Sequence, residues 1–328
     1  MKSERSRALL PSARIIAADA AGIAEAAAIV RGGGLAAFPT ETVYGLAGDA
    51  TSDAAVARIY AAKARPAFNP LIAHVANLGA ALEQGDFSPE ALRLAKAFWP
   101  GPLTLVVPLA PGATVCAAAR AGLQSIALRV PVHPVALSLI SAAGRPLAAP
   151  SANRSGRVSP VTAAHVAEDL ADVIDLVLDG GACPVGLEST VIACLDGRPR
   201  LLRPGGITRA DIEAVLGHAL ARSRDLGAPC SPGMLASHYA PRAKLRLDAI
   251  VLEAGEAGLD FGELFGKRKN VRDLSARRNL DEAAANLFRL LRELDALGLP
   301  RIAVAPIPHE GLGEAINDRL ARAAAPRA

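Results

Sequence analysis

The sequence predicts an α/β protein of two domains. The first is built on a twisted mixed sheet covered by helices, and the second is smaller and Rossmann-like. Helix-like and strand-like segments alternate from residue 17 to residue 211, which is typical of α/β domains. Two apolar segments then flank an Asp196-Gly197 turn and are expected to pair antiparallel, so the sheet should be mixed. The chain has 328 residues, of which 51% are hydrophobic, and it can therefore bury more than one core.

Helices in the first domain are predicted from apolar periodicity and from capping residues. Ser52 or Asp53 caps the second helix, and Arg65-Pro66 ends it. The predicted helices cover residues 20–31, 53–64, 89–98, 135–142 and 163–169. Short apolar runs predict strands at residues 35–38, 71–75, 103–108, 125–130, 147–149 and 174–178. The antiparallel pair is expected at residues 189–195 and 201–203.

A segment rich in glycine and proline, residues 222–241, predicts a linker between two domains. The first domain would then cover residues 1–221 and the second residues 242–328. The second shows a strand, helix, strand, helix pattern, which favours a small Rossmann-like fold. These four elements are expected at residues 245–252, 281–297, 302–305 and 313–324.

Composition excludes several classes of protein. No apolar run approaches the roughly 20 residues of a membrane-spanning helix, and the N-terminal segment lacks the apolar stretch of a secretion signal. Four cysteines without a Cys-x-x-Cys pair argue against disulfide scaffolds and zinc ribbons and favour a reduced, cytoplasmic location. The net charge of +4 permits a polyanionic partner without requiring one. Aromatic residues make up only 3%, which argues against recognition by base stacking.

Two clusters of polar residues follow predicted elements in the first third of the chain. Thr40, Glu41 and Thr42 come after a strand that ends at Pro39, where they either bind a ligand at the strand end or cap a helix. Residues 63–71 place two cations at the end of a helix, Lys63 and Arg65, followed by Asn69 and, further on, His74. The cations either complement the helix dipole or clamp a phosphate.

Two further clusters lie on later strands. By strand alternation Arg129 shares a face with Ser125, and as a cation in apolar surroundings it requires an anion. That anion is either a structural carboxylate or the carboxylate of a substrate. The strand at 147–149 opens into a loop with Ser151, Asn153 and Ser159, which is either a phosphate cradle or an ordinary turn.

The remaining candidates lie near the end of the first domain and in the linker. Ser189 follows Glu188 in a hydroxyl-rich segment, and Arg203 adds a third cation. His238 and Tyr239 lie between the domains, where they either close over a site or act as a spacer. The chain has no Gly-x-x-x-x-Gly-Lys-Ser/Thr loop and no dinucleotide fingerprint, so any ATP chemistry must use another kind of pocket.

Taken in order, these segments resemble the Sua5/YrdC family, the threonylcarbamoyl-AMP synthases of tRNA modification. The resemblance implies a YrdC-like fold for the first domain. Residues 287–295 and 311–320 look like the C-terminal domain of the two-domain Sua5 form. The chain departs from the family's linker pattern at Leu235 and Ala236, which stand where a basic residue and an aromatic are common.

The resemblance implies formation of threonylcarbamoyl-adenylate and pyrophosphate from L-threonine, bicarbonate or CO2, and ATP, with Mg2+. A threonylcarbamoyl transferase complex would receive the product, tRNA is a further candidate partner, and no membrane is involved. The residues implied for the threonine pocket are Thr42, His74, Arg129, Ala149 and Ser189. The residues implied for ATP are Arg65, Asn69, Ser125, Ser151, Asn153, Ser159, Arg203, His238 and Tyr239.

Catalysis is expected to come from positioning and from charge stabilisation by Lys63, Arg65 and Arg203, without a protein nucleophile. Two alternative functions are also compatible with parts of the sequence. A non-catalytic RNA-binding protein is compatible with the mild basic charge, although the few aromatic residues argue against it. A carbamoyl transferase module of hydrogenase maturation proteins shares the YrdC-type domain, but the Cys-x-x-Cys repeats of those proteins are absent here.

Overall fold

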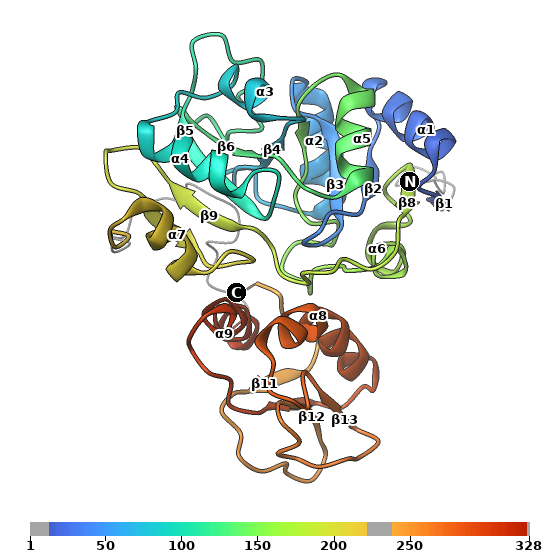
Figure 1. The fold of residues 1–328 in the computed structure, drawn as a ribbon. Helices are drawn as coiled ribbons and strands as arrows, with labels where there is room; N and C mark the ends of the chain where they lie inside the picture. The colour runs from blue at the N-terminus through green and yellow to red at the C-terminus, as the bar shows by residue number, and fades with distance from the viewer. Residues whose placement is uncertain (1–12, 222–237, 327–328) are drawn as a thin grey trace, which may run out of the picture.

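The larger part of the protein is built on one ten-stranded sheet (Figure 1). The computed structural model describes residues 13–221 and 238–326. In spatial order the strands are β1 (Arg14–Ala17), β8 (Leu176–Asp179), β2 (Ala36–Phe38), β3 (Gly45–Asp49), β7 (Leu147–Ala148), β4 (Ile72–His74), β6 (Ser125–Arg129), β5 (Leu103–Pro108), β9 (Thr190–Ala193) and β10 (Arg200–Arg203). Neighbouring strands pair both ways, since β4 runs parallel to β6 and β5 antiparallel to it. The predicted mixed sheet is confirmed.

Helices cover both faces of this sheet. They are α1 (Ala20–Arg31), α2 (Asp53–Lys63), α3 (Leu78–Leu82), α4 (Pro89–Phe98), α5 (Pro134–Ala143), α6 (Ala163–Leu170) and α7 (Arg209–Leu216). Because side chains alternate along a strand, Ala36 and Phe38 of β2 face a core formed with α1 and α5, whereas Ala37 faces the larger core that includes α2. The predicted cap of α2 is confirmed, since the Ser52 side chain accepts a hydrogen bond from the Ala55 amide.

The C-terminal domain has an all-parallel sheet with two helices on one face. Its strands, in spatial order, are β11 (Lys244–Arg246), β14 (Arg301–Val304), β12 (Glu256–Asp260) and β13 (Val271–Asp273). Its helices are α8 (Leu280–Ala296) and α9 (Leu312–Ala324). Figure 1 shows both helices between this small sheet and the first domain, so the helices are the elements that meet the larger domain.

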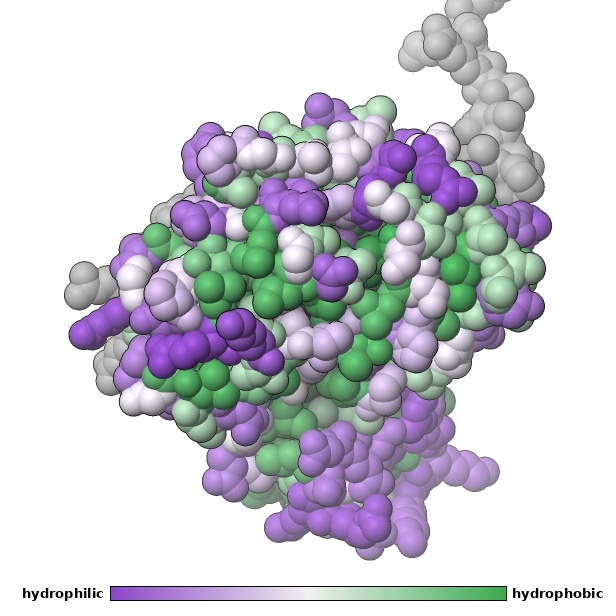
Figure 2. All heavy atoms as spheres, turned by 45° about the horizontal axis from the view of Figure 1, so that its top comes forward, coloured by the Kyte–Doolittle hydropathy of each residue, from purple (hydrophilic) through white to green (hydrophobic). Residues whose placement is uncertain are grey.

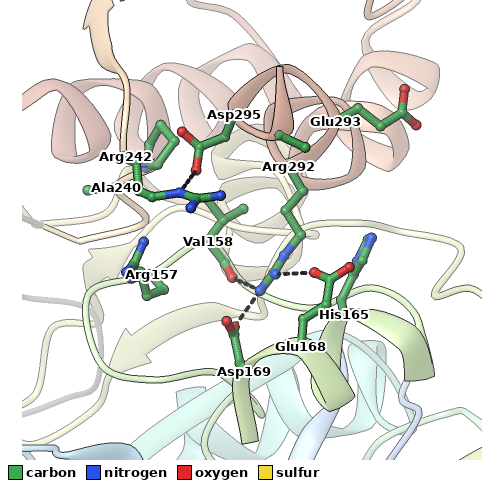
Figure 3. Close-up of a pocket in the computed structure, with 12 residues that line it drawn as sticks. Arg157, Val158, His165, Glu168, Asp169, Ala240, Arg242, Arg292, Glu293 and Asp295 are labelled. Carbon is green, nitrogen blue, oxygen red and sulfur yellow. Dashed lines mark hydrogen bonds and ion pairs between the residues drawn. The ribbon is translucent and has the colours of Figure 1, made fainter. Parts of the chain in front are cut away.

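Polar and backbone contacts join the two domains. Arg292 of α8 reaches α6, where it contacts Glu168 at 3.2 Å and Asp169 at 2.6 Å (Figure 3). A second ion pair joins Arg209 of α7 to Glu314 of α9 at 2.5 Å. Gly186 approaches the backbone of α8 so closely that a Cβ there would lie 2.5 Å from a carbonyl oxygen, and its φ is +72°. The domains therefore meet at tightly fitted points.

Several elements differ from the prediction. Strands β1, β3, β12 and β13 and helices α3 and α7 were not predicted. Strand β3 reads Gly-Leu-Ala-Gly-Asp and β12 also contains glycine, so both lack the β-branched residues that mark a strand. The strand predicted at 245–252 ends at Arg246, because Asp248 adopts a left-handed φ of 52° and the chain turns away.

The surface of the described residues carries scattered apolar side chains. Exposed examples in the first domain are Phe68 and Val132, and in the second Ile250 and Val251. In the view of Figure 2 the lower part of the molecule, where the C-terminal domain lies, is mostly hydrophilic. Within residues 13–221 and 238–326, no helix is both long and apolar enough to cross a bilayer. The domain limits 1–221, 222–241 and 242–328 stay predictions, and most of the linker, residues 222–237, lies outside the described residues.

Candidate active site

A small cavity of about 50 Å³ lies where several strands of the large sheet end. Strands β4 and β6 are parallel and in register, so His74 and Arg129 end side by side. Strand β10 is antiparallel to β9, so Arg203 at its end comes next to Ser189, which precedes β9. The sheet topology therefore brings side chains from distant parts of the sequence to one place.

Most of the predicted site residues line this cavity. Those that do are Thr42, Arg65, His74, Arg129, Ala149, Ser151, Ser189, Arg203, His238 and Tyr239. Those that do not are Lys63, Asn69, Ser125, Asn153 and Ser159. Glu188 also lines the cavity, and no role had been assigned to it. Its place directly before Ser189 was the available signal in the sequence.

Arg129 has a structural carboxylate and still keeps donors for a ligand. Its Nη2 lies 2.7 Å from Oε1 of Glu41, and its Nη1 donates to Oγ1 of Thr42 at 3.0 Å. The two alternatives for its anion are therefore compatible with each other. Among the described residues, Nε and Nη2 have no hydrogen-bond acceptor, because the contact with Glu41 is an ion pair without hydrogen-bond geometry. A buried guanidinium with unfilled donors facing a cavity is suited to bind an oxyanion.

His74 is buried beside Arg129 and is neutral. Burial lowers the pKa of His74 to about 3, and the charge of Arg129 acts in the same direction. The ring nitrogen Nδ1 lies 3.3 Å from the carbonyl oxygen of Ile72, and the edge of the ring packs against Phe38. A neutral imidazole adds a polar wall to the cavity without adding a second cation next to Arg129.

Two more arginines supply positive charge on the other side of the cavity. Arg65 donates from Nη2 to the Pro70 carbonyl at 3.0 Å and from Nε to the Asn69 carbonyl at 3.2 Å. Arg203 donates from Nη2 to the carbonyl of Ser189 at 2.9 Å. Burial lowers the pKa of each of the two arginines, that of Arg65 to about 10, and the charge of Arg203 contributes to the effect on Arg65. This side of the cavity therefore favours a ligand with negative charge.

Lys63 supports the wall of the cavity from behind. It ends α2 and is buried, and its Nζ donates to the carbonyl oxygens of Ser151, at 2.5 Å, and of Asn153. Burial holds the pKa of Lys63 well below its ordinary value, and the charge of Arg65 adds to the effect. Asn153 in turn donates from Nδ2 to the carbonyls of Arg154 and Arg157. These two residues hold the loop that carries Ser151.

Three further predicted residues do not line the cavity. The side-chain amide of Asn69 is buried, and neither Nδ2 nor Oδ1 has a hydrogen-bond partner among the described residues. Ser159 donates to Oε1 of Glu188 at 2.5 Å. Ser125 begins β6 and is partly exposed. An unpartnered buried amide is rare in folded proteins, so Asn69 is a strong candidate for ligand binding.

The cavity is closed from the side of the second domain by His238 and Tyr239. Burial, only partly offset by Glu188, lowers the pKa of His238 to about 3. The ring of Tyr239 stacks on Phe288 of α8 at 5.6 Å and lies under the guanidinium of Arg319 of α9 at 5.1 Å. Tyr239, near the end of the predicted linker, is therefore held by the C-terminal domain.

A metal site made by the protein alone is not found in residues 13–221 and 238–326. No group of three or more His, Cys, Asp or Glu side chains lies close enough to hold an ion. The carboxylates nearest the cavity, Glu41 and Glu188, are each in an ion pair with an arginine.

Comparisons with known proteins match this architecture along the chain. The Sua5/YciO/YrdC family, described as telomere recombination, matches residues 28–205. The family described as the C-terminal domain of threonylcarbamoyl-AMP synthase matches residues 207–325. The chain belongs to the Sua5/YrdC family, in its two-domain form. The two matches together leave no room for the alternative of a carbamoyl transferase module, whose family would not account for the second domain.

Relatives that match along most of the chain include threonylcarbamoyl-AMP synthases. The Bacillus subtilis enzyme of that name is 43% identical over 324 residues, covering 93% of each chain. The crystal structure of Pyrococcus abyssi Sua5 complexed with L-threonine is 39% identical, with a TM-score of 0.84 over 92% of this chain and 94% of that one. A His→Ala and Tyr→Ala double variant of P. abyssi Sua5 has a TM-score of 0.86 at 37% identity, covering 95% and 96%. This chain is accordingly an enzyme, a nucleotidyltransferase of the synthase type, and the alternative of a non-catalytic RNA-binding protein is not supported.

Proposed function

We propose that this cavity is the pocket in which the synthase joins L-threonine, CO2 or bicarbonate, and ATP into threonylcarbamoyl-AMP and pyrophosphate. One observation carries the proposal. Two anion-binding groups meet at one buried cavity: Arg129 with unfilled donors on one side, and Arg65 with Arg203 on the other. An amino acid carboxylate and a triphosphate are the pair of anions that such an arrangement accommodates.

L-threonine is assigned to the side of Arg129. The Nε of Arg129, and its Nη2, which now forms an ion pair with Glu41, would bind the substrate carboxylate, while Glu41 balances the arginine charge when the pocket is empty. Thr42, His74 and Ser189 offer polar groups for the amine and hydroxyl, and Ala149 leaves room for the side chain. The P. abyssi relative solved with L-threonine supports this substrate.

ATP is assigned to the side of Arg65 and Arg203. These two buried cations would stabilise the charge of the phosphates, which grows as pyrophosphate leaves. Asn69 would take a polar group of the nucleotide with its unpartnered amide. Ser151 lines the wall held by Lys63 and Asn153, and Ser159 acts through Glu188. Ser125, His238 and Tyr239 complete the predicted set.

The chemistry needs no protein nucleophile. The amine of threonine forms a C–N bond with CO2 and releases a proton to give the carbamate. A carbamate oxygen then attacks the α-phosphorus, the bond to the bridging oxygen breaks, and pyrophosphate leaves with the electron pair. The protein positions the two anions in a buried pocket that excludes water from the labile carbamate. Mg2+ fits as part of the MgATP substrate, since Mg2+ in such sites is held largely by phosphates and water.

The pocket must widen to admit its substrates. A cavity of about 50 Å³ holds a water molecule or two, whereas pockets for small-molecule ligands span about 300–1,000 Å³. His238 and Tyr239 line the cavity without belonging to a helix or strand of the first domain. We therefore propose that their displacement opens the site.

The decisive experiment measures pyrophosphate release with the full chain and with each substrate omitted in turn. Release that requires threonine, bicarbonate and ATP together supports the proposal, and release without threonine contradicts it. Supply of the product to a threonylcarbamoyl transferase acting on tRNA is tested by adding such a complex and tRNA and measuring modified adenosine.

A variant then tests the assignment of the ATP side. Arg65→Ala removes one of the two cations, so we expect pyrophosphate release to fall at least about 100-fold, as for other charged groups that stabilise a transition state. The circular dichroism spectrum should stay unchanged. Near-normal turnover would remove Arg65 from the mechanism.

A further inference from the structure

One wall of the cavity is held by a charged side chain from the C-terminal domain. Arg319 lies in α9 and is fully buried, although it belongs to the second domain. Its Nε donates to Oε2 of Glu188 at 2.8 Å, and its Nη2 donates to the carbonyl oxygen of Pro204 at 2.9 Å. Pro204 directly follows Arg203, so the Arg319 guanidinium contacts both a carboxylate that lines the cavity and the backbone next to Arg203.

Both oxygens of the Glu188 carboxylate are in use. Oε1 accepts from the Ser159 hydroxyl at 2.5 Å, and Oε2 accepts from Arg319. Burial alone would raise the pKa of Glu188, but the charges of Arg319 and Arg203 and the Ser159 hydrogen bond hold it below the ordinary value. The carboxylate is thus ionised, and it lines the same cavity as Arg65 and Arg203.

Arg319 also holds the segment that closes the cavity. Its guanidinium lies over the Tyr239 ring at 5.1 Å, and the same ring also stacks on Phe288. One turn further along α9, the carbonyl of Arg322 accepts a hydrogen bond from the amide of His238 at 3.2 Å. Asp318 balances part of the charge, with its Oδ2 at 2.5 Å from Nη1 of Arg319.

We propose that Arg319 is a positioning residue of the synthase: it binds Glu188 so that this carboxylate does not occupy Arg203, one of the two arginines proposed for the phosphates of ATP. Without Arg319, Glu188 would remain buried beside Arg203 and would take that cation as its ion-pair partner. An anionic ligand would then have to displace the carboxylate. The site in the first domain is therefore incomplete without the second domain. This inference rests on the proposed ATP site.

The effect should be specific to ATP. Removing one member of a buried charge pair is costly mainly because the other charge remains without a partner. In Arg319→Met we expect the KM for ATP to rise at least about tenfold. The dissociation constant for L-threonine should stay within about twofold, because Arg129 and Glu41 lie on the other side of the cavity. A merely structural role would weaken both ligands alike.

A second substitution identifies the group through which Arg319 acts. The double variant Glu188→Gln/Arg319→Met has no buried carboxylate left to compete for Arg203, so most of the increase in KM for ATP should disappear. Arg319→Lys keeps the positive charge but replaces the planar guanidinium, which can donate to two partners at once, with a single ammonium group. It should give an intermediate KM for ATP. This variant carries the test if Arg319→Met does not fold.

The matched control is Glu314→Gln. Glu314 lies in the same helix as Arg319 and forms another interdomain ion pair, with Arg209. This pair is partly exposed, and neither of its residues lines the cavity. We expect unchanged KM values for both substrates.

Three results would overturn the inference about Arg319: an unchanged KM for ATP in Arg319→Met, an equal loss for threonine and ATP, or no recovery when Glu188→Gln is added. Arg65→Ala serves as the reference in the same assay. If Arg65→Ala leaves ATP use intact, the proposed ATP site itself is wrong. If Arg65→Ala impairs ATP use and Arg319→Met does not, only the role of Arg319 is wrong.

Discussion

Two buried arginines at the cavity differ in how their charge is balanced. Arg129 has Glu41 beside it, whereas Arg65 donates to main-chain carbonyls and, within the described part of the chain, lies in no ion pair with a carboxylate. Ionised groups without compensation are unfavourable in a protein interior. The arginine with the least compensation is therefore the one expected to gain most from a bound phosphate.

The role of Arg129 is tested by Arg129→Ala. The variant removes the guanidinium donors proposed for the threonine carboxylate, so L-threonine should bind on the order of 100-fold more weakly, in line with about 1.5–3 kcal/mol for a hydrogen bond to a charged group. ATP should bind within a few-fold of normal. Isothermal calorimetry with each ligand measures both values, and equal losses for the two ligands would contradict the assignment.

At the residue scale, the sequence predicted most of the cavity lining but not its connections. Thr42 could be named because it follows a predicted strand, Arg129 because strand alternation puts it in apolar surroundings, and Arg203 as a third cation; their ligands came from the family resemblance. Arg319 could not, because an arginine within an amphipathic helix usually lies on the exposed face. Only the packing of α9 against the first domain shows that this side chain is buried.

At the scale of elements, the end of α2 and the loop after β7 form one unit. The helix ends at Ala64 in a left-handed conformation with a φ of 49°, and the chain then turns so that Arg65 lines the cavity. Lys63, one residue earlier, donates to two carbonyls of the loop that carries Ser151. Lys63 and Arg65 thus have different roles: Lys63 supports a loop, and Arg65 faces the cavity.

This division predicts different outcomes for the two cations. Lys63→Met leaves two buried carbonyls without their donor, so we expect the free energy of unfolding to fall by about 1–3 kcal/mol together with pyrophosphate release. Arg65→Ala should reduce pyrophosphate release with a smaller loss of stability. Urea unfolding of both variants makes the comparison. A Lys63→Met protein that is fully stable and inactive would instead indicate a direct role of the Lys63 charge in catalysis.

Most of the predicted elements are confirmed, and the missed ones share a physical cause. Helices with an N-cap and strands rich in β-branched residues carry local signals, and α2 and β5 were predicted within a residue or so. Strand β3 is buried on both faces and relies on small residues, so its conformation is set by the strands on either side of it. In β12 the Glu256 side chain is buried and paired with Arg246 and Arg301, a partnership that appears only in the folded protein.

At the scale of the whole molecule, the two domains share ion pairs, a stacked tyrosine and a close approach of their backbones. Gly186 is the point of closest fit, since a side chain there would meet Ala284 and Ala285 of α8. Gly181 also has a positive φ, but a Cβ there would meet no atom within 4 Å. Substitutions at these two glycines therefore separate the cost of a left-handed backbone conformation from the cost of a clash with α8.

We therefore expect Gly186→Ala to destabilise the protein more than Gly181→Ala. Both variants carry the penalty of a left-handed alanine, about 1–2 kcal/mol, and only the first adds a clash, which typically costs a further 1–3 kcal/mol in well-packed regions. Urea unfolding of the full chain measures the difference. Equal losses in the two variants would show that the contact with α8 does not contribute to stability.

Buried histidines predict the response of the molecule to acid. Burial lowers the pKa of His74 and His238 to about 3, and the partial burial of His165 lowers its pKa to about 4. In the unfolded chain a histidine has a pKa of about 6.5, so below this pH the unfolded state binds protons that the folded state does not. Stability is therefore fully present above pH ~6.5 and declines as the pH falls, by up to about 1.4 kcal/mol per pH unit for each histidine.

The slope can be assigned to one residue. His165 lies in α6 outside the cavity, so His165→Gln should reduce the pH dependence of the unfolding free energy by about 1.4 kcal/mol per pH unit between pH 6 and 5. His218→Gln, at an exposed histidine, is the matched control for the substitution itself. A slope that His165→Gln does not change would show that His165 is accessible to protons in the folded protein.

The burial of Arg319 against Glu188 also limits how such enzymes can be recombined. A chimaera that takes its C-terminal half from another member inherits a new residue at the position of Arg319 but keeps the old acid at Glu188. If the donor half lacks a matching cation, the hybrid carries an orphaned carboxylate inside its catalytic chamber. Successful grafts should thus be those that transplant both members of the pair together.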